Sequence, residues 1–241
     1  MIIQLSNVNS GAENCPYCGK PYKLVTIPAL WDIPERTIRS QTCGCDGELE
    51  AERKRNYYER VKRREQVLRK TGIPKIYWEY EQDSTYLHYI DDPGGVFFFG
   101  DAGRGKTVAA ACLTKAWMNE NPTKRAVFTD AMSLFGYIRQ AYDDGDSERE
   151  AIYHFTGADL LVFDDLGKGR PSEWSLERVE AIINERYEEG LPCIFTSQWS
   201  GDELVDRLAD GGTYESAEAI MSRIGQRCEV VKMDGPDRRL I

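Results

Sequence analysis

The fold is decided by the stretch VFFFGDAGRGKT at residues 96–107. Its first four residues are all apolar, which is typical of a strand buried on both faces of a parallel sheet. The next eight fit the pattern G-x-x-x-x-G-K-[ST], and a run of helix-forming residues follows at 108–118. A strand, a glycine-rich loop and a helix in this order are the context in which that pattern binds phosphate groups.

The loop residues have separate expected roles. Gly100, Gly103 and Gly105 allow backbone N–H groups to curve around a phosphate, while the new helix directs its positive end at the anion. We expect the Lys106 ammonium to contact the β- and γ-phosphates and the Thr107 hydroxyl to bind Mg²⁺. A chance glycine-rich turn would not need these flanking elements, so the sequence predicts a nucleotide site.

Two later strands are expected to bring polar groups to the same edge of the sheet. Residues 160–163 are apolar and end in Asp164 and Asp165, the pattern of a metal-binding acid beside an acid that polarises water. We assign Asp164 to Mg²⁺ and Asp165 to the water. Residues 193–196 predict another strand. The polar residues beyond it, Ser197 and Gln198, would lie between the loop and the acids, where they could sense the terminal phosphate.

Strands and helices alternate through this part of the chain. Residues 125–128 predict a strand, residues 131–142 a helix, and residues 175–188 a helix that ends before Gly190 and Pro192. Alternation of this kind predicts an α/β fold with a parallel, doubly wound sheet.

The chain carries no sign of a membrane or secretory segment. No apolar run approaches the roughly 18–20 residues of a membrane-spanning helix, and the first residues lack the basic and apolar regions of a secretory signal. We therefore expect a cytoplasmic protein without a membrane partner.

Four of the seven cysteines fall near the start, as the pairs Cys15-x-x-Cys18 and Cys43-x-Cys45. Such pairs can place four thiolates around one tetrahedral Zn²⁺. Short strands are expected between them, and a module of about fifty residues buries so little core that a metal would help it fold. Two disulfides are the alternative, which fits poorly with the absence of a secretory signal.

Charge is unevenly distributed. The 241 residues carry a net charge of −9, but residues 51–70 contain nine Lys or Arg and only three Glu. This segment is therefore +6 and predicts a helix, while the remaining residues carry −15. An acidic body excludes a protein that coats nucleic acid with its whole surface. The helix is either a solvated linker or a basic arm that contacts DNA phosphates or a partner protein.

From about residue 72 onward the chain resembles the AAA+ ATPases of the DnaC/DnaI helicase-loader and IstB families. The stretches that carry the resemblance are GIPKIY at 72–77, GDAGRGKT at 100–107, ADLLVFDDLG at 158–167, IINERYEEGLPCIFTSQWS at 182–200 and IMSRIG at 220–225. The resemblance implies an AAA+ P-loop NTPase that binds ATP and single-stranded DNA. It also implies that the cysteine-containing module docks on a hexameric replicative helicase.

Three further residues take their roles from this resemblance. Arg223 matches the arginine finger that reaches the γ-phosphate of a neighbouring subunit, which implies self-association through the ATPase domain; the alternative is an ordinary surface arginine. Arg239 matches a second sensor arginine near the C-terminus. Gln198 departs from the family's usual Ser-Asn at the first sensor and adds a methylene to the reach of the amide.

These expectations combine into one organisation. Residues 1–50 would form a zinc-binding, helicase-docking domain, residues 51–71 a basic linker helix, and residues 72–241 an AAA+ ATPase domain. The expected function is ATP-dependent loading of the replicative helicase during initiation of DNA replication. An IstB-like ATPase that helps a transposase is the alternative, and a P-loop kinase and an inactive nucleotide-binding adaptor are more distant ones.

Overall fold

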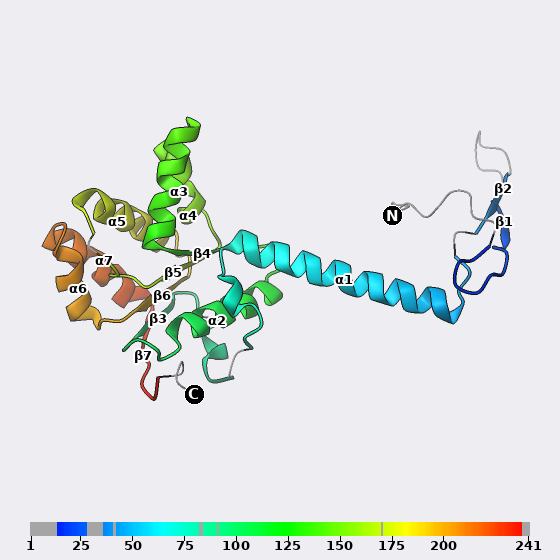
Figure 1. Ribbon diagram of the computed structural model, residues 1–241. Helices are drawn as coiled ribbons and strands as arrows, with labels where there is room; N and C mark the ends of the chain where they lie inside the picture. Colours follow the sequence, from blue (N-terminus) through cyan, green and yellow to red (C-terminus); the bar gives the residue numbers. More distant parts are fainter. Residues whose placement is uncertain are drawn as a thin grey trace. The chain divides into compact units, whose positions relative to one another are not determined.

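The computed structural model describes residues 14–27, 36–40, 42–81, 84–90, 92–169 and 171–237 (Figure 1). The chain divides into two units, with the boundary between Glu65 and Gln66. This boundary falls within a long helix, α1 (Asp46–Thr71), which covers the basic segment expected to be helical. Among the described residues, no helix is both long and apolar enough to cross a membrane.

The first unit contains a small antiparallel hairpin and most of α1. Strand β1 (Leu24–Ile27) pairs with β2 (Arg36–Arg39), and the hydroxyls of Thr26 and Thr37 are 3.2 Å apart across the pair. The two cysteine pairs lie on either side of this hairpin in sequence, and α1 begins directly after Cys45.

The second unit is built on a parallel five-stranded sheet with the order β4-β5-β6-β3-β7 (Figure 1). The strands are β3 (Gly95–Phe99), β4 (Ala126–Asp130), β5 (Leu160–Asp164), β6 (Cys193–Ser197) and β7 (Glu229–Lys232). The first four lie at the expected positions. The edge strand β7 was not expected, because its sequence EVVK is short and half polar.

Helices cover both faces of this sheet, as a doubly wound fold requires. They are α2 (Lys106–Glu120), α3 (Ala131–Asp144), α4 (Glu148–Thr156), α5 (Glu173–Glu188), α6 (Gly201–Ala209) and α7 (Tyr214–Arg227), with short 3₁₀ helices η1 (Lys75–Tyr77) and η2 (Ser84–Ile90). Because side chains alternate along a strand, Phe97 enters the core beneath α3–α7 whereas its neighbour Phe98 enters the core beneath α2. The predicted α/β fold is confirmed.

A fully buried arginine on α5 is hydrogen-bonded to the end of α4 and to the residue before β6. Arg186 on α5 is 0% exposed. Its Nη1 donates to the carbonyls of Phe155 (3.0 Å), in the last turn of α4, and Ala158 (2.6 Å), just after that helix. Its Nη2 donates to the carbonyl of Pro192 (2.7 Å) before β6. Its Nε lies 3.1 Å from the sulfur of Cys193. The guanidinium thus supplies side-chain donors to buried carbonyls at the end of α4 and before the start of β6.

An Arg186→Met substitution should lower the free energy of unfolding by at least about 3 kcal/mol, because each buried carbonyl left without a donor costs about 1–3 kcal/mol. Urea unfolding measures this change. Arg139→Met, at an exposed position of α3, is the matched control and should change the value by no more than about 0.5 kcal/mol. Equal effects of the two substitutions would contradict the role given to Arg186.

Candidate nucleotide and metal sites

The glycine-rich loop connects the end of β3 to the start of α2. Gly100, Gly103 and Gly105 have φ values of 138°, 79° and 89°, in the region that favours glycine over every residue with a Cβ. A Cβ on Gly100 would also lie 2.5 Å from the carbonyl oxygen of Met233. The backbone therefore requires glycine at these places, and α2 begins with its unpaired N–H groups at the loop.

Lys106 is folded into this loop. Its side chain is only 5% exposed, and its Nζ donates to the carbonyl oxygens of Gly100 (2.6 Å) and Asp101 (2.7 Å). Burial lowers the pKa of Lys106, and the nearby carboxylates of Asp165 and Asp164 oppose this shift. A buried ammonium that donates to neutral carbonyls is well suited to an anionic ligand. This donor set fits the phosphate groups of ATP.

The paired acids follow β5 and are held by a hydroxyl of the neighbouring strand. The Thr196 hydroxyl donates to Oδ1 of Asp164 (2.7 Å) and accepts from the backbone N–H of Asp165 (2.8 Å). Burial raises the pKa of Asp164 to about 6, and hydrogen bonds from Thr196 and Thr107 limit the rise. Carboxylate and hydroxyl oxygens are ligands that Mg²⁺ accepts, so Asp164 and Thr107 together fit that ion.

Asp165 occupies a strained backbone position. Its φ is 54°, and it is the one non-glycine residue with a positive φ in the part of the chain that the structure describes. Hydrogen bonds with the end of β6 stabilise this backbone conformation. Leu166 N–H donates to the carbonyl of Thr196 (2.8 Å), and the Ser197 hydroxyl donates to the carbonyl of Leu166 (2.7 Å). The Asp165 carboxylate forms an ion pair with Lys168 at 2.7 Å.

Thr196 was not predicted as a site residue, and Ser197 was predicted only as a polar group that, with Gln198, could sense the terminal phosphate. The hydrogen bonds made by the hydroxyls of Thr196 and Ser197 were not predicted. Both side chains are fully buried. Two adjacent hydroxyls at the end of an otherwise apolar strand were the available signal, because buried polar groups are nearly always hydrogen-bonded to something specific.

A cavity of about 520 Å³ lies beside the loop. Its size is within the range of small-molecule sites. The predicted residues that line it are Gly103, Gly105, Lys106, Thr107, Asp165 and Gln198. Gly100 and Asp164 lie just behind this lining, in contact with Lys106 and Thr107 respectively.

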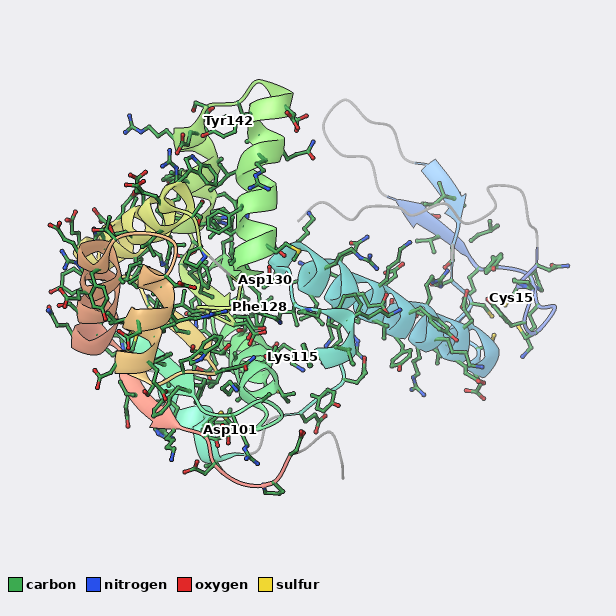
Figure 2. All side chains as sticks on the ribbon, turned by 60° about the vertical axis from the view of Figure 1, so that its left-hand side comes forward. Cys15, Asp101, Lys115, Phe128, Asp130 and Tyr142 are labelled. Carbon is green, nitrogen blue, oxygen red and sulfur yellow. The ribbon has the colours of Figure 1, made fainter. Side chains whose placement is uncertain are left out.

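Apolar and aromatic residues also line the cavity, and they were not predicted. They are Ile76, Tyr77, Tyr80, Tyr86 and Cys112. Lys115 of α2, labelled in Figure 2, donates to the carbonyls of Tyr77 (2.8 Å), Trp78 (3.1 Å) and Tyr80. The Cys112 thiol reaches the same carbonyl of Tyr80 at 3.4 Å. These hydrogen bonds hold residues 77–80 in place beside the cavity. The Tyr77 and Tyr80 side chains form an apolar surface on which a flat ring, such as a nucleotide base, can pack.

The two expected arginines lie elsewhere. Arg223 on α7 does not line this cavity; it lines a separate hollow with Gly94 and Tyr187, and its guanidinium carbon is 6.0 Å from the Tyr187 ring centroid. Gly94 precedes β3, so Arg223 lies at the edge of the sheet opposite the loop. Any contact with a γ-phosphate would therefore involve a neighbouring subunit. Arg239 lies outside the described residues.

The four early cysteines come together in the first unit. Their sulfur atoms all lie within 4.8 Å of one another, with Cys15 and Cys45 3.7 Å apart and Cys18 and Cys43 3.5 Å apart (Cys15 is labelled in Figure 2). Four thiolates about 2.3 Å from one tetrahedral Zn²⁺ would be separated by about 3.8 Å. The cluster therefore fits zinc. All four cysteines are free, so the alternative of two disulfides is not what the structure contains.

The second cysteine pair is also attached to α1. Oε2 of Glu48 accepts from the backbone N–H groups of Cys43 (2.5 Å) and Gly44 (2.6 Å), and Leu49 N–H donates to the carbonyl of Cys45 (3.0 Å). Burial opposes ionisation of Cys15, but hydrogen bonds from the backbone at Tyr17 and Cys18 lower its pKa to about 7. Glu48 was not predicted, because its role depends on the turn that follows Cys43.

A Thr196→Val substitution should lower kcat for ATP hydrolysis about tenfold or more, because hydrogen bonds to charged groups are worth about 1.5–3 kcal/mol. The loop residues are unchanged, so KM and the calorimetric affinity for ATP should stay within about twofold. Thr129→Val is the matched control: this threonine is also buried, on β4, but its hydroxyl contacts the carbonyl of Asp130 instead of the paired acids. Equal losses of kcat would contradict the positioning role.

The purified full chain should contain about one equivalent of zinc, measured by elemental mass spectrometry. Cys18→Ser and Cys43→Ser should each reduce this to less than about half, because each removes one of four ligands. Cys228→Ala, at a buried cysteine of the second unit, should leave the zinc content unchanged. Zinc that persists in both serine variants would exclude this site.

Comparisons with known proteins agree with this geometry. Residues 81–241, well over half of the chain, match the family model described as IstB-like ATP binding protein. Among curated proteins, the replicative helicase loader DnaI of Bacillus subtilis (strain 168) is 24% identical over 168 residues, covering 66% of this chain and 53% of DnaI. The uncharacterised protein YqaM of the same organism is 26% identical over 141 residues, covering 55% of this chain and 40% of YqaM. The chain thus spans only about half of these two relatives.

Solved structures support the same fold. The crystal structure of the DnaC helicase loader superimposes with a TM-score of 0.56 at 24% sequence identity, covering 67% of this chain and all of that one. AMPPCP-bound DnaA from Aquifex aeolicus gives a TM-score of 0.52 at 18% identity, covering 68% of this chain and 48% of DnaA. With the family match and the geometry of the loop, these likenesses lead to one conclusion: the chain belongs to the IstB-like ATP-binding protein family, and its second unit has the fold of the DnaC and DnaA structures.

Proposed function

We propose that this protein is an ATP-dependent loader of the replicative DNA helicase, which binds ATP and single-stranded DNA during initiation of replication. The observation that carries the proposal is the similarity to DnaI, a replicative helicase loader, over 66% of the chain. Because that similarity covers only 53% of DnaI, the partners and the activity of the whole protein are part of the proposal.

The proposed division of labour follows the chain. Residues 1–50, with Zn²⁺ at Cys15, Cys18, Cys43 and Cys45, dock on the hexameric helicase; residues 51–71 are a basic linker; and residues 72–241 form the ATPase domain. A docking role explains why a separate cysteine-containing module is present. The protein acts in the cytoplasm, where replication takes place.

In the ATPase domain, each residue has a proposed task that its position supports. The N–H groups of the loop around Gly103 and the Lys106 ammonium bind the phosphates, and Thr107 and Asp164 hold Mg²⁺, which would neutralise phosphate charge when bound. Asp165 polarises the attacking water after leaving its ion pair with Lys168.

Three further residues have proposed roles in sensing the nucleotide or in contacting it from a second subunit. Gln198, exposed at the cavity, reports the terminal phosphate, and Arg239 acts as the second sensor. Arg223 acts on the nucleotide of a neighbouring subunit, so ATP turnover requires at least transient self-association. The ATP cycle gates assembly and release of the helicase.

The second candidate is an IstB-like ATPase that helps a transposase. It is favoured by the family model itself, whose description refers to IstB. This reading uses the same nucleotide site but leaves the cysteine-containing module without a role.

The test is co-purification of the full chain with the host's replicative helicase and, separately, with a candidate transposase, in ATP and in ADP. We expect capture of the helicase that differs between the two nucleotides. Lys106→Ala should abolish that difference, because removal of the ammonium should weaken ATP binding at least about tenfold, measured by calorimetry. Lys124→Ala, at an exposed lysine on the loop after α2, is the matched control.

The outcomes separate the candidates. Nucleotide-sensitive capture of the transposase without capture of the helicase would overturn the loader proposal in favour of the second candidate. Unchanged ATP affinity in the Lys106→Ala variant would instead overturn the assignment of the phosphate site.

A further inference from the structure

The long helix α1 presents a basic surface that the nucleotide site does not use. Every residue from 52 to 67 is exposed, and the buried residues of the helix, Leu68 and Thr71, lie in its last turn. A helix whose residues are exposed on every side has no core to face over this length. Its sequence must therefore be explained by something other than packing against the described part of its own chain.

Cations dominate this exposed stretch and form an ordered stripe. Residues 52–67 contain seven Lys or Arg and three Glu. Arg53, Tyr57, Arg60 and Arg64 follow one another at spacings of four, three and four residues, which places them on one face of the helix. No acidic residue occupies a position of this stripe.

Two exposed tyrosines interrupt the cations. Tyr57 is 56% exposed and Tyr58 is 68% exposed, and their ring centroids lie 5.8 Å apart in an edge-to-face arrangement. Large exposed aromatic rings among arginines are the combination on which bases stack while guanidinium groups contact phosphates.

We infer that the Arg53–Arg64 face of α1 is a binding surface for single-stranded DNA. Arginine accounts for six of the nine cations between residues 51 and 70, and this segment rises about 30 Å as a helix, enough to follow several nucleotides. The aromatic rings select a single strand, because the bases of a duplex are not available for stacking. The rest of the chain carries −15 and repels the same ligand.

The energetics of the free helix favour this ligand. Arg60 and Arg64 are four residues apart, a spacing at which like charges destabilise a helix. Lys54 is neutralised within the chain by Glu50 at 2.7 Å. A polyanion bound along the stripe would relieve the repulsion between its arginines. The inference deepens the proposed function, since it places the DNA contact of that proposal on a defined surface.

The test uses the full chain and fluorescence anisotropy with a labelled oligothymidine of about 16 nucleotides, and with a duplex of equal length. Arg53→Gln combined with Arg60→Gln should weaken binding to the single strand about tenfold at low salt. It should also reduce the slope of log affinity against log salt concentration by about 1.4, which is 0.7 for each lost contact. Tyr57→Ala should weaken binding to the single strand about fivefold or more.

The matched control is Arg139→Gln combined with Arg149→Gln, which removes the same charge from exposed positions of α3 and α4. It should change the affinity less than about twofold. Equal losses in the two double variants, or equal binding of duplex and single strand, would overturn the inference. Circular dichroism verifies that α1 remains helical in each variant.

Capture of the helicase is measured in parallel and keeps the two proposals apart. An α1 double variant that loses DNA but still captures the helicase supports both. A variant that keeps DNA and loses the helicase would show that α1 faces a protein and would overturn only this inference.

Discussion

The central position of β6 between β3 and β5 determines where each group of the nucleotide site lies. In a parallel sheet all strands end at the same edge, so the loop after β3, the acids after β5 and the hydroxyls of β6 meet there. Thr196 is the physical link, because its hydroxyl binds Asp164 and the backbone of Asp165 at once. The strained φ of Asp165 is maintained because the neighbouring strand supplies these bonds.

The sequence allowed prediction of the groups that are close to one another along the chain. The strand, loop and helix at residues 95–120 and the acids at the end of β5 follow from local patterns, and so does the pairing of cysteines into two knuckles. Thr196, Lys115 and Glu48 could not be assigned in this way, since their partners depend on strand order or on a turn. The buried Arg186 is a similar case: a charged residue on α5 gives no local sign that it donates to carbonyls at the end of α4 and before β6.

The nucleotide site and the helix α1 place their charged side chains in opposite ways. The nucleotide site keeps one cation, Lys106, deeply buried and opposes it with two carboxylates of the same cavity edge. The helix α1 does the reverse and exposes its cations over many turns. The net charge of −9 shows neither arrangement, because it is a sum over the buried charges of the nucleotide site and the exposed charges of α1.

The attachment of α1 to the cysteine knuckle fixes the directions in which the exposed side chains of the helix point. Glu48 and Leu49 bond the first turn to Cys43, Gly44 and Cys45, so the angular position of the following α1 side chains, up to residue 65, is set relative to the cysteine cluster. One residue inserted after Glu52 would turn the following α1 residues of the first unit by about 100° relative to the knuckle, while advancing them by only about 1.5 Å. An insertion of seven residues would restore the original azimuth to within about 20°. An insertion in this helix therefore changes the direction of the exposed cations much more than their distance from the knuckle.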